Sequence, residues 1–164
     1  MTADDPLLLI NTFLGKVGSV GQVFDENNSL ALSFDGITIG IRKDDIRQLL
    51  VVNAVIAAMP RPSNAACAGA LAAAYADILE ASLGGIMTGA GAIGFSSERD
   101  LLVYGNAIGF DGLSQHSFEA FLERTVNAIE AWRQRAGHWQ RTEDDSRDAS
   151  VMAVASDMLE VIAV

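Results

Sequence analysis

Residues 29–42 read SLALSFDGITIGIR, and this stretch does most to decide the fold. Two runs of alternating apolar and polar residues flank Asp35-Gly36, a dipeptide typical of a two-residue β-hairpin turn. Alternate residues of a strand point to the same side, so pairing through this turn gathers six apolar side chains on one face. They form the cross-strand pairs Phe34–Ile37, Leu32–Ile39 and Leu30–Ile41. The sequence therefore predicts an antiparallel hairpin with one buried face.

A third apolar run, QLLVVNAVIAA at residues 48–58, follows the hairpin. We interpret it as another strand, with a helix as the competing interpretation. Its apolar residues fall on both faces, with Leu49, Val51 and Val55 on one and Leu50, Val52 and Ile56 on the other. A strand that is apolar on both faces needs cover on both. We expect the second cover to come from another chain or from a helix elsewhere in this one.

Helices are predicted before and after these strands. Residues 5–17 are amphipathic, and Asp5 is placed to cap them. Residues 64–83 form an alanine-rich helix whose larger apolar residues lie on one stripe: Leu71, Tyr75, Ile78, Leu79 and Leu83. The strongest helical pattern spans residues 117–135, where apolar residues recur at three- and four-residue steps. Its apolar face comprises Phe118, Phe121, Leu122, Val126, Ile129 and Trp132.

The C-terminal part has a different character. Polar sequence begins at Gly137 and is interpreted as a linker, and residues 148–162 form a short amphipathic helix. Such a helix is not stable alone, so it must dock on this chain, on a second copy or on a partner. We therefore divide the chain into a folded domain at residues 1–136 and an acidic extension with an amphipathic helix at residues 137–164.

The stretch TGAGAIG at residues 88–94 contains the spacing G-x-G-x-x-G, with Asp111 about 20 residues further on, as in dinucleotide-binding turns. Such a turn must follow a strand and open a helix. Here the helix at 64–83 comes first, and two predicted strands follow, AIGF at 92–95 and LLVYGNAIGF at 101–110. This order is the reverse of the required one. A nucleotide-binding enzyme using these glycines is kept as an alternative interpretation.

Composition restricts the class of protein. The chain has 164 residues, half of them hydrophobic, and a net charge of −10, which argues against nucleic acid and anionic membranes as partners. Cys67 is the only cysteine, so no intramolecular disulfide can form, as expected in a reducing cytosol. The acidic N-terminus does not resemble a signal peptide, and its apolar run is too short to span a bilayer. We expect a soluble, cytoplasmic protein without membrane insertion.

Motifs for catalysis, metals or cofactors are missing from the sequence. Neither a zinc-binding His or Cys pattern nor a nucleophile elbow occurs, and the two histidines, His116 and His138, lie in polar surroundings. The carboxylates occur in charge runs typical of solvated surface. We therefore predict no enzymatic activity, no catalytic residues, no metal and no cofactor.

The order of elements resembles the class I chaperones of type III secretion, the family of the Tir and YopE chaperones. The resemblance covers about residues 5–136 and is clearest in the C-terminal half. The order there is a long helix, a glycine-rich junction, a short strand, a polar turn, a strand and a final helix that ends near a Trp. In this sequence the corresponding residues are GAIGF at 91–95, SSERD at 96–100, LLVY at 101–104 and the helix from Phe118 to Trp132.

This resemblance implies a fold, a function and partners. The fold is α+β, helix–three antiparallel strands–helix–two strands–helix, and the protein is a homodimer in the cytoplasm of a Gram-negative bacterium. It binds the N-terminal region of one or more secreted effectors, keeps that region extended, and delivers it to the export apparatus, whose ATPase helps release the chaperone. A non-secretion adaptor with the same fold is a further alternative, since fold alone does not determine function.

Two sets of site residues follow from combining the resemblance with the residue pattern. An edge strand of the hairpin can accept an extended partner, and the helix at 5–17 can form the wall of a groove beside it. The residues predicted for this effector groove are Leu9, Phe13, Leu30, Leu32, Phe34, Ile39, Ile41, Leu50 and Val52. The residues predicted for the dimer interface are Leu71, Tyr75, Leu101, Leu102, Val103 and Tyr104. Within the hairpin, partner contacts are expected at the rim, because the inward face also forms the chain's own core.

Overall fold

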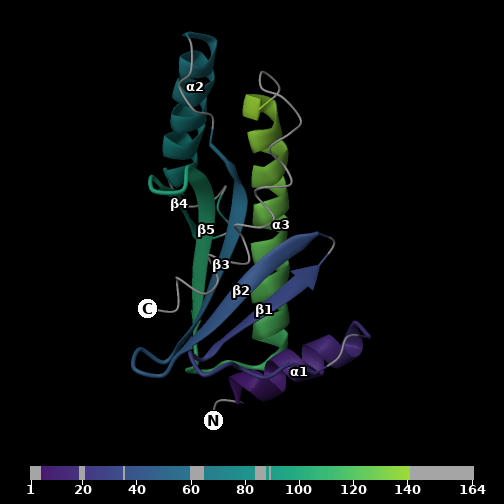
Figure 1. The fold of residues 1–164 in the computed structure, drawn as a ribbon. Coiled ribbons are helices and arrows are strands. Elements are labelled where there is room, and N and C mark those ends of the chain that lie inside the picture. The colour runs from purple at the N-terminus through teal and green to yellow at the C-terminus, as the bar shows by residue number, and fades with distance from the viewer. Residues whose placement is uncertain are drawn as a thin grey trace.

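The computed structural model describes residues 5–18, 21–34, 36–59, 65–83, 88 and 90–140, without the side chains of 65–67, 70 and 140. In these ranges, three helices and five strands follow in the predicted order, which confirms the α+β class (Figure 1). Their bounds are α1 Pro6–Lys16, β1 Ser29–Phe34, β2 Ile37–Asp44, β3 Leu49–Ala58, α2 Ala65–Ser82, β4 Ala92–Ser96, β5 Leu101–Gly109 and α3 Gln115–Gln140.

The five strands form one antiparallel sheet in the order β1-β2-β3-β5-β4. The hairpin has the predicted register, with Phe34 opposite Ile37, followed by the Leu32–Ile39 and Leu30–Ile41 pairs. Gly36 in its turn has a φ of 79°, in the left-handed region that glycine enters without strain. Local turn chemistry and two-residue periodicity were therefore sufficient to predict this part of the fold.

The third apolar run is a strand, β3, at the centre of the sheet. Leu50 and Val52 are fully buried on the face that forms the core. Leu49, Val51 and Asn53 alternate with them on the opposite face and are partly exposed. The competing interpretation of residues 48–58 as a helix is therefore wrong.

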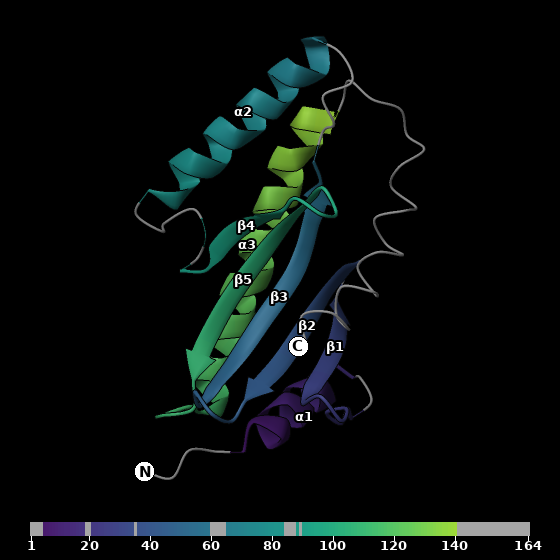
Figure 2. The same ribbon diagram turned by 60° about the vertical axis from the view of Figure 1, so that its left-hand side comes forward.

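Helix α3 runs along one face of the sheet and provides most of its cover (Figures 1 and 2). Ser114 caps its start, because the Ser114 Oγ accepts a hydrogen bond from the Ser117 N–H at 3.3 Å, and the Ser117 Oγ accepts one from the Ser114 N–H at 2.9 Å. The predicted apolar face is confirmed, since Phe118, Ile129 and Trp132 are almost completely buried.

Helix α3 is longer than the predicted helix at residues 117–135, because it continues through Gly137 to Gln140. A glycine inside a helix costs about 1 kcal/mol relative to alanine. Trp139 offsets this cost: its ring is buried against Trp132, at 6.3 Å between ring centroids, and its Nε1 donates a hydrogen bond to the Asp77 carboxylate at 3.0 Å. Residues 141–164, with the predicted amphipathic helix, lie outside the described residues, so the proposed division of the chain stays a prediction.

Helix α2 lies beside the C-terminal half of α3 and extends beyond the sheet (Figure 2). Only part of the predicted apolar stripe lies on its buried face, where Leu71 and Ile78 pack against the core. Ala74 and Ala81 are buried, whereas Leu79 is 69% exposed and Leu83 is 80% exposed. Small side chains let two helices approach closely, so Ala74 and Ala81 contribute to the internal contact, while Leu79 and Leu83 point away from it.

Candidate partner-binding surface

Strand β1 leaves one edge of the sheet open. The N–H and C=O of Ser29 both bond to Asp25, the N–H to its carboxylate and the C=O to its backbone N–H, at 2.8 Å each. Alternate residues of a strand direct their backbone groups to the same side, so Ala31 and Ser33 present theirs to the same edge. In the described part of the chain, these groups of Ala31 and Ser33 have no hydrogen-bond partner.

An open groove of about 710 Å³ lies beside this edge. Residues 31–34 of β1 line one side, and the end of α1 with the segment after it lines the other, through Leu14, Val17, Gly18 and Gln22. The Asn11 side chain accepts from the Gln22 N–H at 2.7 Å and donates to the Gln22 C=O at 3.0 Å, which fixes this segment to α1. A free strand edge beside a partly apolar groove is the geometry that strand addition requires.

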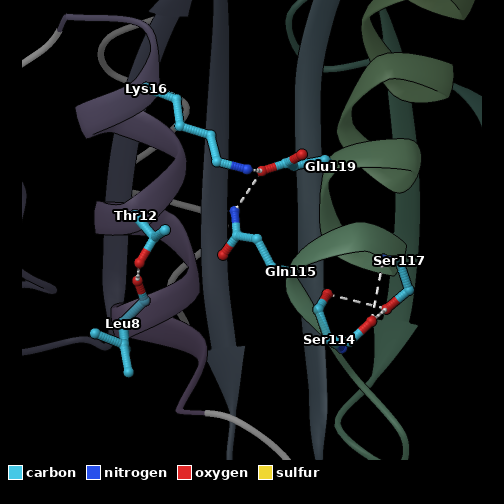
Figure 3. A network of polar contacts seen from close by, with 7 residues as sticks. All are labelled: Leu8, Thr12, Lys16, Ser114, Gln115, Ser117 and Glu119. Carbon is cyan, nitrogen blue, oxygen red and sulfur yellow. Dashed lines mark hydrogen bonds and ion pairs between the residues drawn. The ribbon is translucent and has the colours of Figure 1, made fainter.

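Contacts with α3 hold α1 in place beside β1. The Lys16 Nζ forms an ion pair with the Glu119 Oε1, and the Gln115 Nε2 donates to the same oxygen at 2.6 Å (Figure 3). The hydrogen bond from Lys16 is the main reason that the pKa of Glu119 lies below its ordinary value. Phe13 packs edge-on against Phe34 at 5.8 Å between ring centroids, which joins α1 to β1 directly.

The residues predicted for the effector groove divide into two groups. Seven of them are buried in the core: Leu9, Leu30, Leu32, Ile39, Ile41, Leu50 and Val52. Phe13 and Phe34 are only half-buried, and Phe34 lines the groove. Of the buried residues, only Leu32 lines the groove, and the others belong to the core of the chain. Phe34 lies at the rim of the hairpin, where contacts were expected.

Several groove residues were not predicted, among them Val17, Gln22, Ala31 and Ser33. Ala31 and Ser33 lie on the polar face of the hairpin, and their contribution to a partner would come from the backbone. Hydrophobic periodicity reports where side chains point, so it does not identify an open backbone edge. The arrangement of strands in the sheet supplies that information.

The residues predicted for the dimer interface also differ in burial. Leu101, Leu102 and Tyr104 are buried within one chain, while Leu71 and Val103 are half-buried. Tyr75 is 38% exposed and packs edge-on against Phe95 of β4, at 5.9 Å between ring centroids. With Leu79 of α2 and Leu83, which follows the end of α2, these two rings form an exposed apolar surface.

The glycine stretch connects a helix to a strand, as the sequence predicted, which is the reverse of a dinucleotide-binding turn. Thr88 accepts a hydrogen bond through its backbone oxygen from the Tyr104 hydroxyl at 2.9 Å. A Cβ atom on Gly91 would lie 2.3 Å from that hydroxyl oxygen. Burial raises the pKa of Tyr104, consistent with a neutral hydroxyl that acts as a donor. The absence of a side chain at Gly91 thus permits close packing on Tyr104.

The described residues contain neither a group of His, Cys, Asp and Glu side chains arranged to hold a metal ion nor a helix able to cross a membrane.

The sequence model of the Tir chaperone protein (CesT) family matches residues 8–133, well over half of the chain. A comparison of this chain with curated proteins gave no significant match.

Solved structures share the fold at low sequence identity. A chain of the ExsC–ExsE complex is 17% identical with a TM-score of 0.63, over 78% of this chain and 90% of that one. A chain of the Yersinia pestis type III secretion chaperone SycH in complex with a YscM2 fragment is 14% identical, with a TM-score of 0.56, over 76% and 97%. A chain of the ExoU–SpcU complex from the type III secretion system of Pseudomonas aeruginosa is 13% identical, with a TM-score of 0.56, over 82% and 99%.

Proposed function

The chain belongs to the Tir chaperone protein (CesT) family, and on this premise we propose that it is a type III secretion chaperone. It binds the N-terminal region of one or more effector proteins, keeps that region extended and competent for export, and delivers it to the secretion apparatus. The observation that carries this proposal is the open edge of β1 beside the groove at α1.

The open edge suggests how an extended segment is held. The backbone of the effector segment would bond to the free N–H and C=O groups of Ala31 and Ser33. Alternate side chains of the segment would enter the groove near Val17 and Phe34. An extended segment loses conformational entropy when it is ordered, so a long interface is needed to offset this cost. This mode of binding requires neither a cofactor nor a covalent step, which supports a role without catalysis.

The exposed apolar surface of α2 supports a homodimer. Tyr75, Leu79 and Phe95 present contiguous apolar side chains, and a twofold axis would bury this patch against its own copy. The predicted contacts through Leu71 and Val103 belong to the same proposal. We place the complex in the bacterial cytoplasm, with the export ATPase as a further partner, and assign residues 137–164 to an extension of the chaperone domain.

The test is co-expression with proteins encoded beside its gene, followed by purification and limited proteolysis. We expect two copies of the chain to hold one effector and to protect its N-terminal segment. Ala31→Pro removes the free N–H at the edge of β1 without removing a hydrogen bond of the sheet, so it should abolish protection. Ala31→Ser keeps the N–H and should behave as wild type. Equal protection by both variants would exclude strand addition at β1.

A further inference from the structure

We propose that a pocket on the sheet face opposite α3 is a specificity subsite for a glutamine or asparagine side chain of the docked partner strand. This proposal rests on the proposed function, because it requires a partner strand at the edge of β1. It adds a chemical requirement for the sequence of that strand. The groove at α1 recognises apolar side chains on one face of the strand, and the new subsite recognises an amide on the other.

The pocket has a volume of about 450 Å³ and lies across β1, β2 and β3. Ala31, Gly40 and Asn53 are cross-strand neighbours and all line it, together with Arg42. The loop before β1 closes one side through residues 25–27. Ala31 has a small side chain and Gly40 has none, which leaves space above the sheet between Arg42 and Asn53.

Arg42 is the group that requires a ligand. Its Nε is buried and has no hydrogen-bond partner, and Arg42 forms no ion pair within the described part of the chain. A guanidinium offers only donors, and a buried donor without an acceptor is unfavourable. A partner side chain that pairs with this donor has to provide a hydrogen-bond acceptor, such as a carbonyl or a carboxylate oxygen.

The acidic side of the pocket decides between these acceptors. The Asp25 Oδ1 accepts from the N–H groups of Asn27 and Ser29 at 2.9 and 2.8 Å, and Glu26 is an exposed second carboxylate. Asp25 and Glu26 line the pocket together with Arg42, so a carboxylate from the partner would be a third acidic group there and would be repelled. A lysine or arginine side chain would leave the Arg42 donor unsatisfied. A side-chain amide suits both sides, since its carbonyl accepts from Arg42 and its NH₂ group donates to a carboxylate.

The position of Ala31 connects this pocket to the open edge. Ala31 lines both the pocket and the groove beside β1. Neighbouring strands lie about 4.8 Å apart, and residues directly opposite each other point to the same face. The partner residue opposite Ala31 therefore projects onto the face of the pocket. A glutamine there can extend across the small Ala31 side chain toward Arg42.

The experiment uses a phage-displayed library of random peptides selected on the full-length protein. Peptides whose binding is lost on Ala31→Pro are strand-docked, provided that circular dichroism shows that this variant keeps its fold. We expect these peptides to be enriched in glutamine or asparagine at one position. Replacing that amide with methionine should weaken binding to wild type about tenfold, as expected for a hydrogen bond to a charged group. The same replacement should not change peptide binding to the Arg42→Met variant, which keeps the aliphatic stem but lacks the guanidinium. Circular dichroism checks that this variant keeps its fold.

The outcomes separate the subsite from strand docking itself. Strand-docked peptides without amide enrichment, or with equal losses on wild type and Arg42→Met, would overturn the subsite and leave strand docking intact. Enrichment of acidic or basic residues at that position would overturn the assignment of an amide. If no selected peptide responds to Ala31→Pro, strand docking at β1 is wrong and the subsite fails with it.

Discussion

Replacing Gly91 with alanine should strongly destabilise the protein, because the new Cβ has no space. It would lie 2.3 Å from the Tyr104 Oη, 2.4 Å from its Cζ and 2.7 Å from the Gly105 backbone oxygen. Non-bonded carbon atoms normally lie about 3.5–4.0 Å apart, so the ring would have to move by more than about 1 Å. Tyr104 is fully buried and donates to the Thr88 backbone oxygen at 2.9 Å, so it cannot move freely.

The magnitude follows from two costs. Overpacking a buried site costs about 1–3 kcal/mol, and leaving the buried Tyr104 hydroxyl without its acceptor costs about 1–3 kcal/mol more. The expected loss of about 2–6 kcal/mol is large beside a typical domain stability of about 5–15 kcal/mol. The free energy of unfolding should be measured by urea denaturation at one fixed protein concentration, since dimerisation would make it concentration-dependent.

Gly94→Ala is the matched control within the same glycine stretch. Its Cβ would meet only the Val103 Cγ2, at an ordinary 3.6 Å, so we expect a change within about 1 kcal/mol. If Gly91→Ala were as stable as Gly94→Ala, the packing argument would be refuted. Saturable binding of NAD or ATP to the wild-type protein would instead support the nucleotide-binding alternative.

Three further perturbations test separate contacts. Trp139→Phe keeps an aromatic ring but removes the donor to Asp77, so unfolding by urea should show a loss of about 1–3 kcal/mol; unchanged stability would contradict a role in fixing α2. The pKa of Glu119 is held below its ordinary value of 4.5, mainly by the hydrogen bond from Lys16. The ionised carboxylate therefore stabilises the fold above pH 4.5, and this contribution is lost as the pH falls through the lowered pKa. The stability difference between wild type and Glu119→Gln should therefore shrink in acid and in high salt, and a difference that is independent of pH would oppose this account. Leu79→Glu places a charge on a side chain that is 69% exposed in one chain, so it should leave the fold intact but yield a monomer by light scattering; a persistent dimer would exclude the α2 surface.

Local patterns in the sequence were sufficient for much of the fold. Asp35-Gly36 and the alternation around it predicted the register of the hairpin to the residue, because turn geometry and two-residue periodicity both act within a few residues. The spacing from Phe118 to Trp132 predicted the buried face of α3, because helical periodicity is also a local property of the sequence. The end of α3 was not predictable from local sequence, since Gly137 favours termination and this is offset by tertiary contacts of Trp139 with Trp132 and Asp77.

The candidate site depended far more on tertiary structure. The alternation of residues 29–34 predicted that Leu30 and Leu32 point inward. The backbone groups of Ala31 and Ser33 are open to a partner only because the strand order leaves β1 unpaired on one side. The stripe of leucines on α2 was visible in the sequence, but which face meets α3 was decided by the close fit of Ala74 and Ala81. Hydrophobic periodicity states which side chains avoid water. Which backbone edge stays open, and which apolar face stays uncovered, depends on contacts between segments far apart in the chain.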